Sequence, residues 1–198
     1  MRQLGVSGAW LMEPKVLRDI RGSFCEVFRE SILNESCGRS LQIAQVSCSV
    51  SRRGVVRGIH YTDTQPGQDK YVTCVYGAVL DVAVDLRVGS PTYARWEAYQ
   101  LDDVTCRATY ITAGLGHGFA VLSEEATLLY LCSSEYVPGQ ERCVSPFDAE
   151  LAITWPPSQE RIVSDRDASA PTLAEARQLG QLPLYRDFSA KDSSCDGS

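Results

Sequence analysis

The chain is poor in histidine. Its 198 residues include only two, His60 and His117, and neither belongs to a His-x-His pair. Imidazole-rich metal sites usually need at least three protein ligands, so two isolated histidines make a poor metal site. We therefore expect neither a catalytic metal nor any other cofactor.

Several other features are scarce or absent. No run approaches the length of a transmembrane helix, and the N-terminus "MRQLGVSGAW" has no long apolar stretch, so we expect neither a membrane span nor a secretory signal. Basic residues are outnumbered, and the net charge of −6 argues against general nucleic-acid binding. The eight cysteines form no CxxC pair, which favours free thiols in the cytoplasm.

Most of the chain has the pattern of β-strands. Every even position from Val72 to Val88 is apolar, which predicts one apolar face, interrupted by a turn or bend near Gly77. The stretch 107–137 reads as three further strands, with a Gly-rich loop after the first and a "SEE" turn after the second. No helical period runs through these segments.

Two segments carry helical signals. One covers residues 29–38 and ends at Gly38, and the other has a capping-box pattern at Thr172 and Glu175 with Gly180 as its stop. Many short strands with few helices predict an all-β jelly-roll barrel or sandwich with short flanking helices, including one near the C-terminus. We expect one domain over residues 1–186 and a flexible polar tail over 187–198.

A few polar residues on apolar strands are candidates for chemistry. Alternation places His60 on a face with the small residues Gly58 and Thr62, where it either reaches a cavity or is a core histidine bonded to a carbonyl. His117, between two glycines, is either a turn residue or close to a ligand. Tyr130 lies on an otherwise apolar face and needs a hydrogen-bond partner, either in the core or as a phenolic acid.

Two further residues have equally open interpretations. Lys70 begins a strand just after a polar loop and, taken alone, is a solvated lysine. Asp167 lies in the turn before the last helix, where aspartate ordinarily serves as a turn or cap residue.

Six blocks of the sequence together resemble one known family. The blocks are "EPKVLRDIRGSFCEVF", "GVVRGIHYT", "LDVAVDLRVGSPTY", "GHGFAVLSEEATLLY", "SSEYVPGQE" and "IVSDRDASAPTLAEA". In this order they resemble the dTDP-4-dehydrorhamnose 3,5-epimerases over about residues 10 to 185. Within that family the chain is most similar to the antibiotic deoxysugar branch, in particular to 3-epimerases of the mycinose (6-deoxyallose) type. The resemblance implies a metal-free, cupin-like jelly roll that forms a homodimer.

The resemblance also implies a reaction and roles for several residues. The substrate would be a dTDP-linked 4-keto-6-deoxyhexose, whose C3 and C5 hydrogens lie α to the ketone. Such an enzyme needs a base, an acid on the opposite face and a cation near the enolate oxygen. By resemblance His60 is the base with Asp167 as its partner, Tyr130 is the acid, and Lys70 stabilises the enolate. His117 would lie near the sugar, and Asp81 would support the site.

The resemblance assigns a nucleotide-binding half as well. Its residues are Arg21 and Arg57 for the diphosphate, Phe24 and Glu26 for the thymine, Gln45 as a polar contact, and Tyr136 near nucleotide and sugar. Arginines contacting the diphosphate would let an acidic protein bind a dianionic ligand. Residues would be shared across the dimer interface, and which subunit supplies each contact is open.

Three features conflict with this picture or depart from the family pattern. Ser47 stands where the rhamnose enzymes tend to have Asn, and Leu17 replaces a more usual Phe; both bear on the shape of the pocket and on which carbon is inverted. Strict alternation also places Arg57 on the face opposite His60. Both reach one site only if the strand bulges or bends at Gly58, or if a dimer uses both faces.

The sequence favours a C3 epimerase and leaves alternatives open. With the same residues, the enzyme could invert C5, or both C3 and C5. A 3,4-ketoisomerase on a related barrel matches the six blocks less well, and a non-catalytic nucleotide-sugar binder would be expected to lack His60, Lys70 or Tyr130. A metal-dependent cupin oxygenase would need the missing His-x-His.

Overall fold

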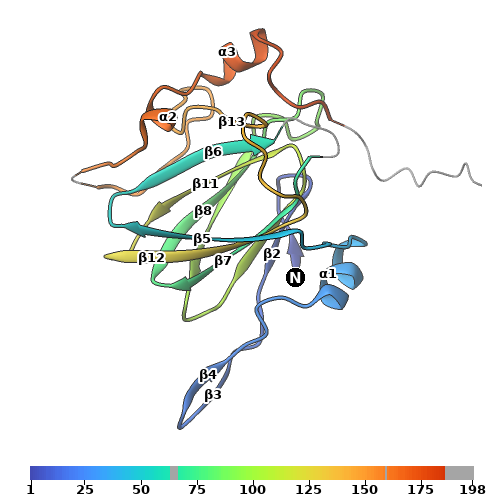
Figure 1. Ribbon diagram of the computed structural model, residues 1–198, viewed down its shortest axis with the longest axis vertical. Helices are drawn as coiled ribbons and strands as arrows, with labels where there is room; N and C mark the ends of the chain where they lie inside the picture. Colours follow the sequence, from blue (N-terminus) through green and yellow to red (C-terminus); the bar gives the residue numbers. More distant parts are fainter. Residues whose placement is uncertain (63–66, 159, 186–198) are drawn as a thin grey trace, which may run out of the picture.

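A computed structural model describes residues 1–62, 67–158 and 160–185 of the chain. Two antiparallel sheets face each other and form a β-sandwich, which confirms the predicted fold class (Figure 1). The larger sheet has six strands in the spatial order β1 (Arg2–Gln3), β2 (Ala9–Met12), β10 (Ala108–Ile111), β7 (Lys70–Tyr76), β12 (Glu125–Cys132) and β5 (Gln45–Arg52).

The second sheet faces the inner side of the first. It has five strands in the order β13 (Glu141–Cys143), β6 (Val56–Thr62), β11 (Leu115–Val121), β8 (Ala78–Asp85) and β9 (Trp96–Asp102). A separate two-stranded ribbon of β3 (Leu17–Asp19) and β4 (Gly22–Phe24) extends away from the sandwich, as Figure 1 shows at its lower edge.

The apolar run after Lys70 does not form one face. Val72 and Cys74 in β7 pack into the core between the two sheets. Val82 and Val84 in β8, although also at even positions, pack instead into a second core on the outer side of the five-stranded sheet. The chain passes from one sheet to the other through a turn at Gly77, whose φ of +74° suits a glycine. The predicted β-strands and the turn near Gly77 are confirmed, but the prediction that the even positions form one continuous apolar face is wrong.

Three short helices cover the sandwich. Helix α1 (Glu30–Cys37) ends at Gly38, as predicted, and this glycine adopts the left-handed conformation and donates its N–H to the Asn34 carbonyl at 2.7 Å. Helix α3 (Leu173–Gln178) begins with the predicted capping box of Thr172 and Glu175. Between β13 and α3 along the chain, the one-turn helix α2 (Asp165–Ala168) takes the place of the predicted turn at Asp167.

Other sequence predictions are tested only in part. Among the described residues no helix is long and apolar enough to cross a membrane. Seven cysteines in this part of the chain are free thiols, whereas Cys195 and the predicted tail beyond residue 186 lie outside it.

Candidate active site

A cavity of about 400 Å³ lies between the two sheets near their open edges. Strands β5, β7 and β12 line it from the six-stranded sheet, and β6 and β11 line it from the five-stranded sheet. His60, Lys70, His117 and Tyr130 all lie on its wall. The structure therefore brings together four of the residues that the sequence singled out.

A bulge in β6 places Arg57 and His60 on the same face. His117 of β11 is paired with His60, but Phe119, two residues further, is paired with Arg57, three residues away along β6. The extra residue reverses the alternation, so both side chains line the cavity. The predicted bulge at Gly58 is thus confirmed.

Glycine is required at the bulge for two reasons. Gly58 has a φ of +114°, and a Cβ atom there would lie 2.6 Å from the Gly118 Cα and 2.6 Å from the His117 carbonyl oxygen. Only a residue without a side chain allows both this backbone angle and this close approach of the two strands.

Asp167 of helix α2 contacts both the His60 ring and the backbone of β6. Its Oδ1 lies 2.7 Å from His60 Nε2, and its Oδ2 accepts the Gly58 N–H at 3.2 Å. Its backbone N–H is in turn fixed by the Ser164 hydroxyl at the start of α2. Burial raises the pKa of the Asp167 carboxyl, but the hydrogen bond and charge of His60 and the Gly58 N–H together leave it below the usual value. The lowered pKa makes Asp167 a carboxylate, and its hydrogen bond fixes the orientation of the His60 ring; such a pair can favour an imidazolium over a neutral imidazole.

Tyr130 approaches the cavity from the opposite sheet. Its hydroxyl lies 3.1 Å from the Ser49 Oγ of the neighbouring strand β5. Burial is the largest influence on the pKa of this phenol and raises it. The hydrogen bond with Ser49 and the charge of Arg57 lower the pKa, whereas the charge of Asp81 raises it. The resulting pKa lies well above the usual range for tyrosine. Because His60 and Tyr130 belong to facing sheets, a ligand between them is contacted on two sides.

A second histidine–aspartate pair lies beside the first. His117 is buried in the middle of β11, so its interpretation as a turn residue is wrong. Its Nε2 lies 2.6 Å from Asp81 Oδ1, and its ring meets the Tyr130 ring edge-on at 6.1 Å between centroids. Asp81 Oδ2 is buried without a hydrogen-bond partner among the described residues. This pair gives the cavity floor a fixed polar group next to Tyr130.

Lys70 begins β7, as predicted, and takes part in a charge network that sequence reasoning missed. Its Nζ lies 3.8 Å from Glu141 Oε1, and Arg166, the neighbour of Asp167 in α2, donates to Glu141 Oε2 at 2.9 Å. Glu141 stands in the quoted block "SSEYVPGQE" and lines the cavity. No local pattern reveals its role, because its partners come from strand β7 and helix α2, both distant in the sequence.

The residues assigned to the nucleotide divide into two groups. Gln45, Ser47, Arg57 and Tyr136 line the cavity; Gln45 Nε2 donates to Ser47 Oγ at 2.7 Å, and Gln45 Oε1 accepts the Tyr136 N–H at 2.7 Å. The Ser47 departure therefore lies in the cavity wall.

Arg21, Phe24 and Glu26 are not brought to this cavity. Arg21 and Phe24 lie on the β3–β4 ribbon, where Arg21 pairs with Asp19, and Glu26 just beyond it pairs with Arg29. Leu17 is on the same ribbon and does not line the cavity either. Within one chain these residues lie apart from the cavity, because β3 and β4 pair only with each other among the described strands. Which subunit supplies each nucleotide contact, left open by the sequence, stays open here.

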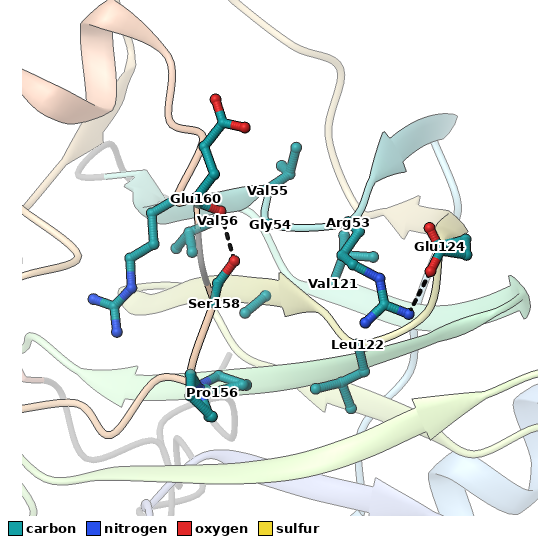
Figure 2. A pocket seen from close by; sticks show the side chains of 13 residues that line it. Arg53, Gly54, Val55, Val56, Val121, Leu122, Glu124, Pro156, Ser158 and Glu160 are labelled. Carbon is teal, nitrogen blue, oxygen red and sulfur yellow. Dashed lines mark hydrogen bonds and ion pairs between the residues drawn. The ribbon is translucent and has the colours of Figure 1, made fainter.

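A larger cavity lacks the facing histidine and tyrosine of the first. It measures about 640 Å³ and lies between the Arg53–Gly54 turn and residues 156–158 and 160–161 (Figure 2). Arg53 is paired with Glu124 at 2.7 Å, and the Ser158 hydroxyl donates to the Glu160 carbonyl at 2.6 Å. Its lining contains no histidine, cysteine or tyrosine. The smaller cavity is therefore the candidate active site.

In residues 1–62, 67–158 and 160–185, no three His, Cys, Asp or Glu side chains gather in a way that could hold a metal ion.

Comparison with known proteins identifies relatives over nearly the whole chain. The chain is 54% identical to dTDP-4-dehydrorhamnose 3-epimerase from Streptomyces niveus, covering 93% of this chain and 89% of that one. It is 50% identical to dTDP-4-dehydro-6-deoxyglucose 3-epimerase from Streptomyces bikiniensis, covering 94% and 95%. It is 49% identical to dTDP-4-dehydrorhamnose 3,5-epimerase from Mycolicibacterium smegmatis, covering 96% and 93%.

A solved structure agrees in fold. The crystal structure of an H60N/Y130F double mutant of ChmJ, a 3'-monoepimerase from Streptomyces bikiniensis in complex with dTDP, matches with a TM-score of 0.90 at 49% identity, covering 93% of each chain. The family model described as dTDP-4-dehydrorhamnose 3,5-epimerase matches residues 3–175. The chain therefore belongs to the dTDP-4-dehydrorhamnose 3,5-epimerase family, a family of isomerases.

Proposed function

We propose that this protein is a 3-epimerase of dTDP-4-keto-6-deoxyglucose in antibiotic deoxysugar biosynthesis, and that it works by general acid–base catalysis. The observation that carries the proposal is the placement of His60, held by Asp167, and Tyr130 on facing sheets of one cavity. Inversion at carbon requires a proton to leave one face and another to arrive on the opposite face. A base and an acid on opposite walls meet that requirement.

Each step can be assigned to a side chain. His60 removes the C3 proton, and the C3–H electrons move into the C3–C4 bond while the C4 oxygen becomes an enolate. The Asp167 carboxylate stabilises the imidazolium at 2.7 Å. The Lys70 ammonium offsets the charge on the enolate oxygen. Tyr130 then gives its proton to C3 from the opposite face and inverts that carbon.

The C3 position is favoured over the alternatives by the relatives. Two of the three relatives named above are 3-epimerases, as is ChmJ, although the M. smegmatis relative at similar identity is a 3,5-epimerase. The histidine and tyrosine replaced in ChmJ carry the numbers 60 and 130 in that chain, as His60 and Tyr130 do here. This supports the two roles assigned to them.

The β3–β4 ribbon suggests how the nucleotide site is completed. Leu17, Ile20 and Phe24 are 50%, 105% and 65% exposed, and an isolated two-stranded ribbon with apolar side chains in water is marginal. In our proposal the protein is a homodimer in which this ribbon carries Arg21 and Phe24 to the partner's cavity. Sedimentation equilibrium showing only a monomer would contradict this. The free thiols of the described cysteines support a cytoplasmic location.

The proposed reaction is tested by incubating the enzyme with the 4-keto substrate in heavy water and following deuterium by NMR. Label at C3 alone is expected. Label at both C3 and C5 would indicate the 3,5-epimerase alternative, and absence of label would refute epimerisation. The His60→Asn variant is the matched control: it should lose exchange while still binding dTDP, and near-normal turnover would show that His60 is not the base.

A further inference from the structure

Strand β5 has an unusual division between its two faces. Its inward side chains, Gln45, Ser47, Ser49 and Ser51, are all polar, whereas the outward positions between them are Val46, Cys48 and Val50. This is the reverse of the ordinary arrangement, in which the inward face of a sandwich strand is apolar. The inward face of β5 therefore presents hydrogen-bonding groups where a sandwich strand ordinarily presents apolar ones.

Each inward serine has a different partner there. Ser47 accepts from Gln45, and Ser51 accepts from Arg57 Nε at 3.0 Å. Ser49 lies 3.1 Å from the Tyr130 hydroxyl. The first two partners were assigned to nucleotide binding above, and only Ser49 contacts a residue assigned to the proton transfer.

The contact between Ser49 and Tyr130 is diagonal across the strand pair. Tyr130 is directly opposite Ser47, and Ser49 is directly opposite Leu128. A tyrosine can reach a diagonal neighbour in an antiparallel pair. The phenol leans along β5 toward Ser49, and this direction fixes where its hydroxyl lies in the cavity.

The direction of the proton in this hydrogen bond follows from the chemistry. Tyr130 can give its proton to a substrate carbon only if its O–H points into the cavity, so its oxygen must accept from Ser49. Among the described residues Ser49 is the one hydrogen-bond partner of the Tyr130 hydroxyl. When the proton leaves, a phenolate forms close to Asp81, which disfavours a second negative charge.

We propose that Ser49 is a positioning residue for Tyr130: its hydroxyl donates to the phenol oxygen, directs the phenolic proton into the cavity and stabilises the phenolate left after transfer. This deepens the proposed function and rests on it. In the transfer the Tyr130 O–H bond breaks, a C–H bond forms at the inverted carbon, and the Ser49 O–H···O⁻ hydrogen bond strengthens. No other reactant is needed.

Deuterium exchange and inversion at the same carbon of one substrate can be measured separately. Removal of the proton by His60 followed by its return to the same face replaces hydrogen by solvent deuterium without inversion. Only protonation by Tyr130 gives the inverted product. In Ser49→Ala we expect the rate of inversion to fall about tenfold or more, as for loss of a hydrogen bond to a charged group. Exchange without inversion should change less than about twofold.

Matched variants distinguish positioning from a structural role. Ser49→Thr keeps the hydroxyl and should restore the ratio of exchange to inversion, while Ser49→Cys, whose thiol is a weak donor, should give an intermediate ratio. Ser31→Ala removes an exposed serine of α1 and should match the wild type. If Ser49→Ala is too unstable to assay, the other two variants decide the question. The exchange-to-inversion ratio should then match the wild type in Ser49→Thr and exceed it in Ser49→Cys.

The outcomes keep the two proposals apart. A wild-type enzyme that neither exchanges nor inverts would refute the proposed function. A wild-type enzyme that does both, with an unchanged exchange-to-inversion ratio in Ser49→Ala or Ser49→Cys, would overturn the role of Ser49. A parallel fall of exchange and inversion would do the same, because it would indicate general damage to the cavity.

Discussion

Replacement of Gly58 by alanine tests whether the bulge in β6 depends on the close approach of β11. The added Cβ would lie 2.6 Å from both the Gly118 Cα and the His117 carbonyl oxygen, and both are backbone atoms that cannot rotate away. The φ of +114° is in addition unfavourable for any residue with a side chain. Two independent penalties therefore act at one position.

The magnitude can be worked from these two penalties. A left-handed backbone costs a residue with a Cβ roughly 1–2 kcal/mol. Overpacking against fixed atoms costs about 1–3 kcal/mol. The sum, roughly 2–5 kcal/mol, is a large share of a typical free energy of unfolding of about 5–15 kcal/mol. With a urea m-value of about 2 kcal/mol per molar, the midpoint of unfolding should fall by about 1–2.5 M.

Gly89→Ala is the matched control in the urea experiment. Gly89 has a φ of +89°, but nothing lies within 4 Å of the Cβ position, so it carries the backbone penalty without the clash. The difference between the two variants isolates the close approach. In Gly58→Ala, C3 exchange should also fall, because relief of the clash would displace the backbone N–H that donates to Asp167, the partner of His60. Equal midpoints for the two variants would refute the link between the bulge and the approach of β11.

Two further predictions concern buried carboxylates. In a urea titration, Asp85→Asn should lower the free energy of unfolding by about 3–5 kcal/mol, because it leaves the buried Arg87 guanidinium without its carboxylate. The control Glu124→Gln removes an exposed ion pair and should lower the free energy of unfolding by less than about 1 kcal/mol. Because folding lowers the pKa of Asp167, its contribution to stability is present above the unfolded pKa of about 4 and is lost as pH falls through the lower folded value. The stability gap between wild type and Asp167→Asn should therefore shrink on acidification.

Specific results would contradict these two predictions. Equal losses in Asp85→Asn and Glu124→Gln would mean that burial of the Asp85 pair has no energetic consequence. A stability gap for Asp167→Asn that stays constant or widens from pH 6 to pH 3 would show that the pKa of Asp167 is not lowered by folding.

Local patterns in the sequence determined much of the fold. Alternation of apolar and polar residues depends on neighbours along the chain, and it correctly predicted β7 and β8 and the break at Gly77. The capping box at Thr172 and the terminal Gly38 are equally local, and both helix ends were found. The family resemblance supplied several of the residues that line the cavity, His60 and Tyr130 above all.

Other features are fixed only by contacts between distant segments. The sheet to which a strand belongs is set by pairing partners far along the chain, so the valines of β8 face a different core from those of β7. The Lys70–Glu141–Arg166 network joins three separate elements, and the Ser49–Tyr130 contact spans 81 positions of sequence. None of these pairs has a signature in its local sequence.

The stretch "GVVRGIHYTD" shows the division most clearly. Its residues by themselves indicated a strand whose histidine either reaches a cavity or is buried in the core, and only the family resemblance made His60 a base and Arg57 an anchor for the diphosphate. Alternation indicated that the two share a site only if the strand bends at Gly58 or a dimer uses both faces. The tertiary structure decided that they do, because packing against Gly118 forces the register shift that turns both side chains inward. It also decided that Asp167, 107 residues later, meets His60. Alternation is a property of one strand, whereas register and facing sheets are properties of the folded whole.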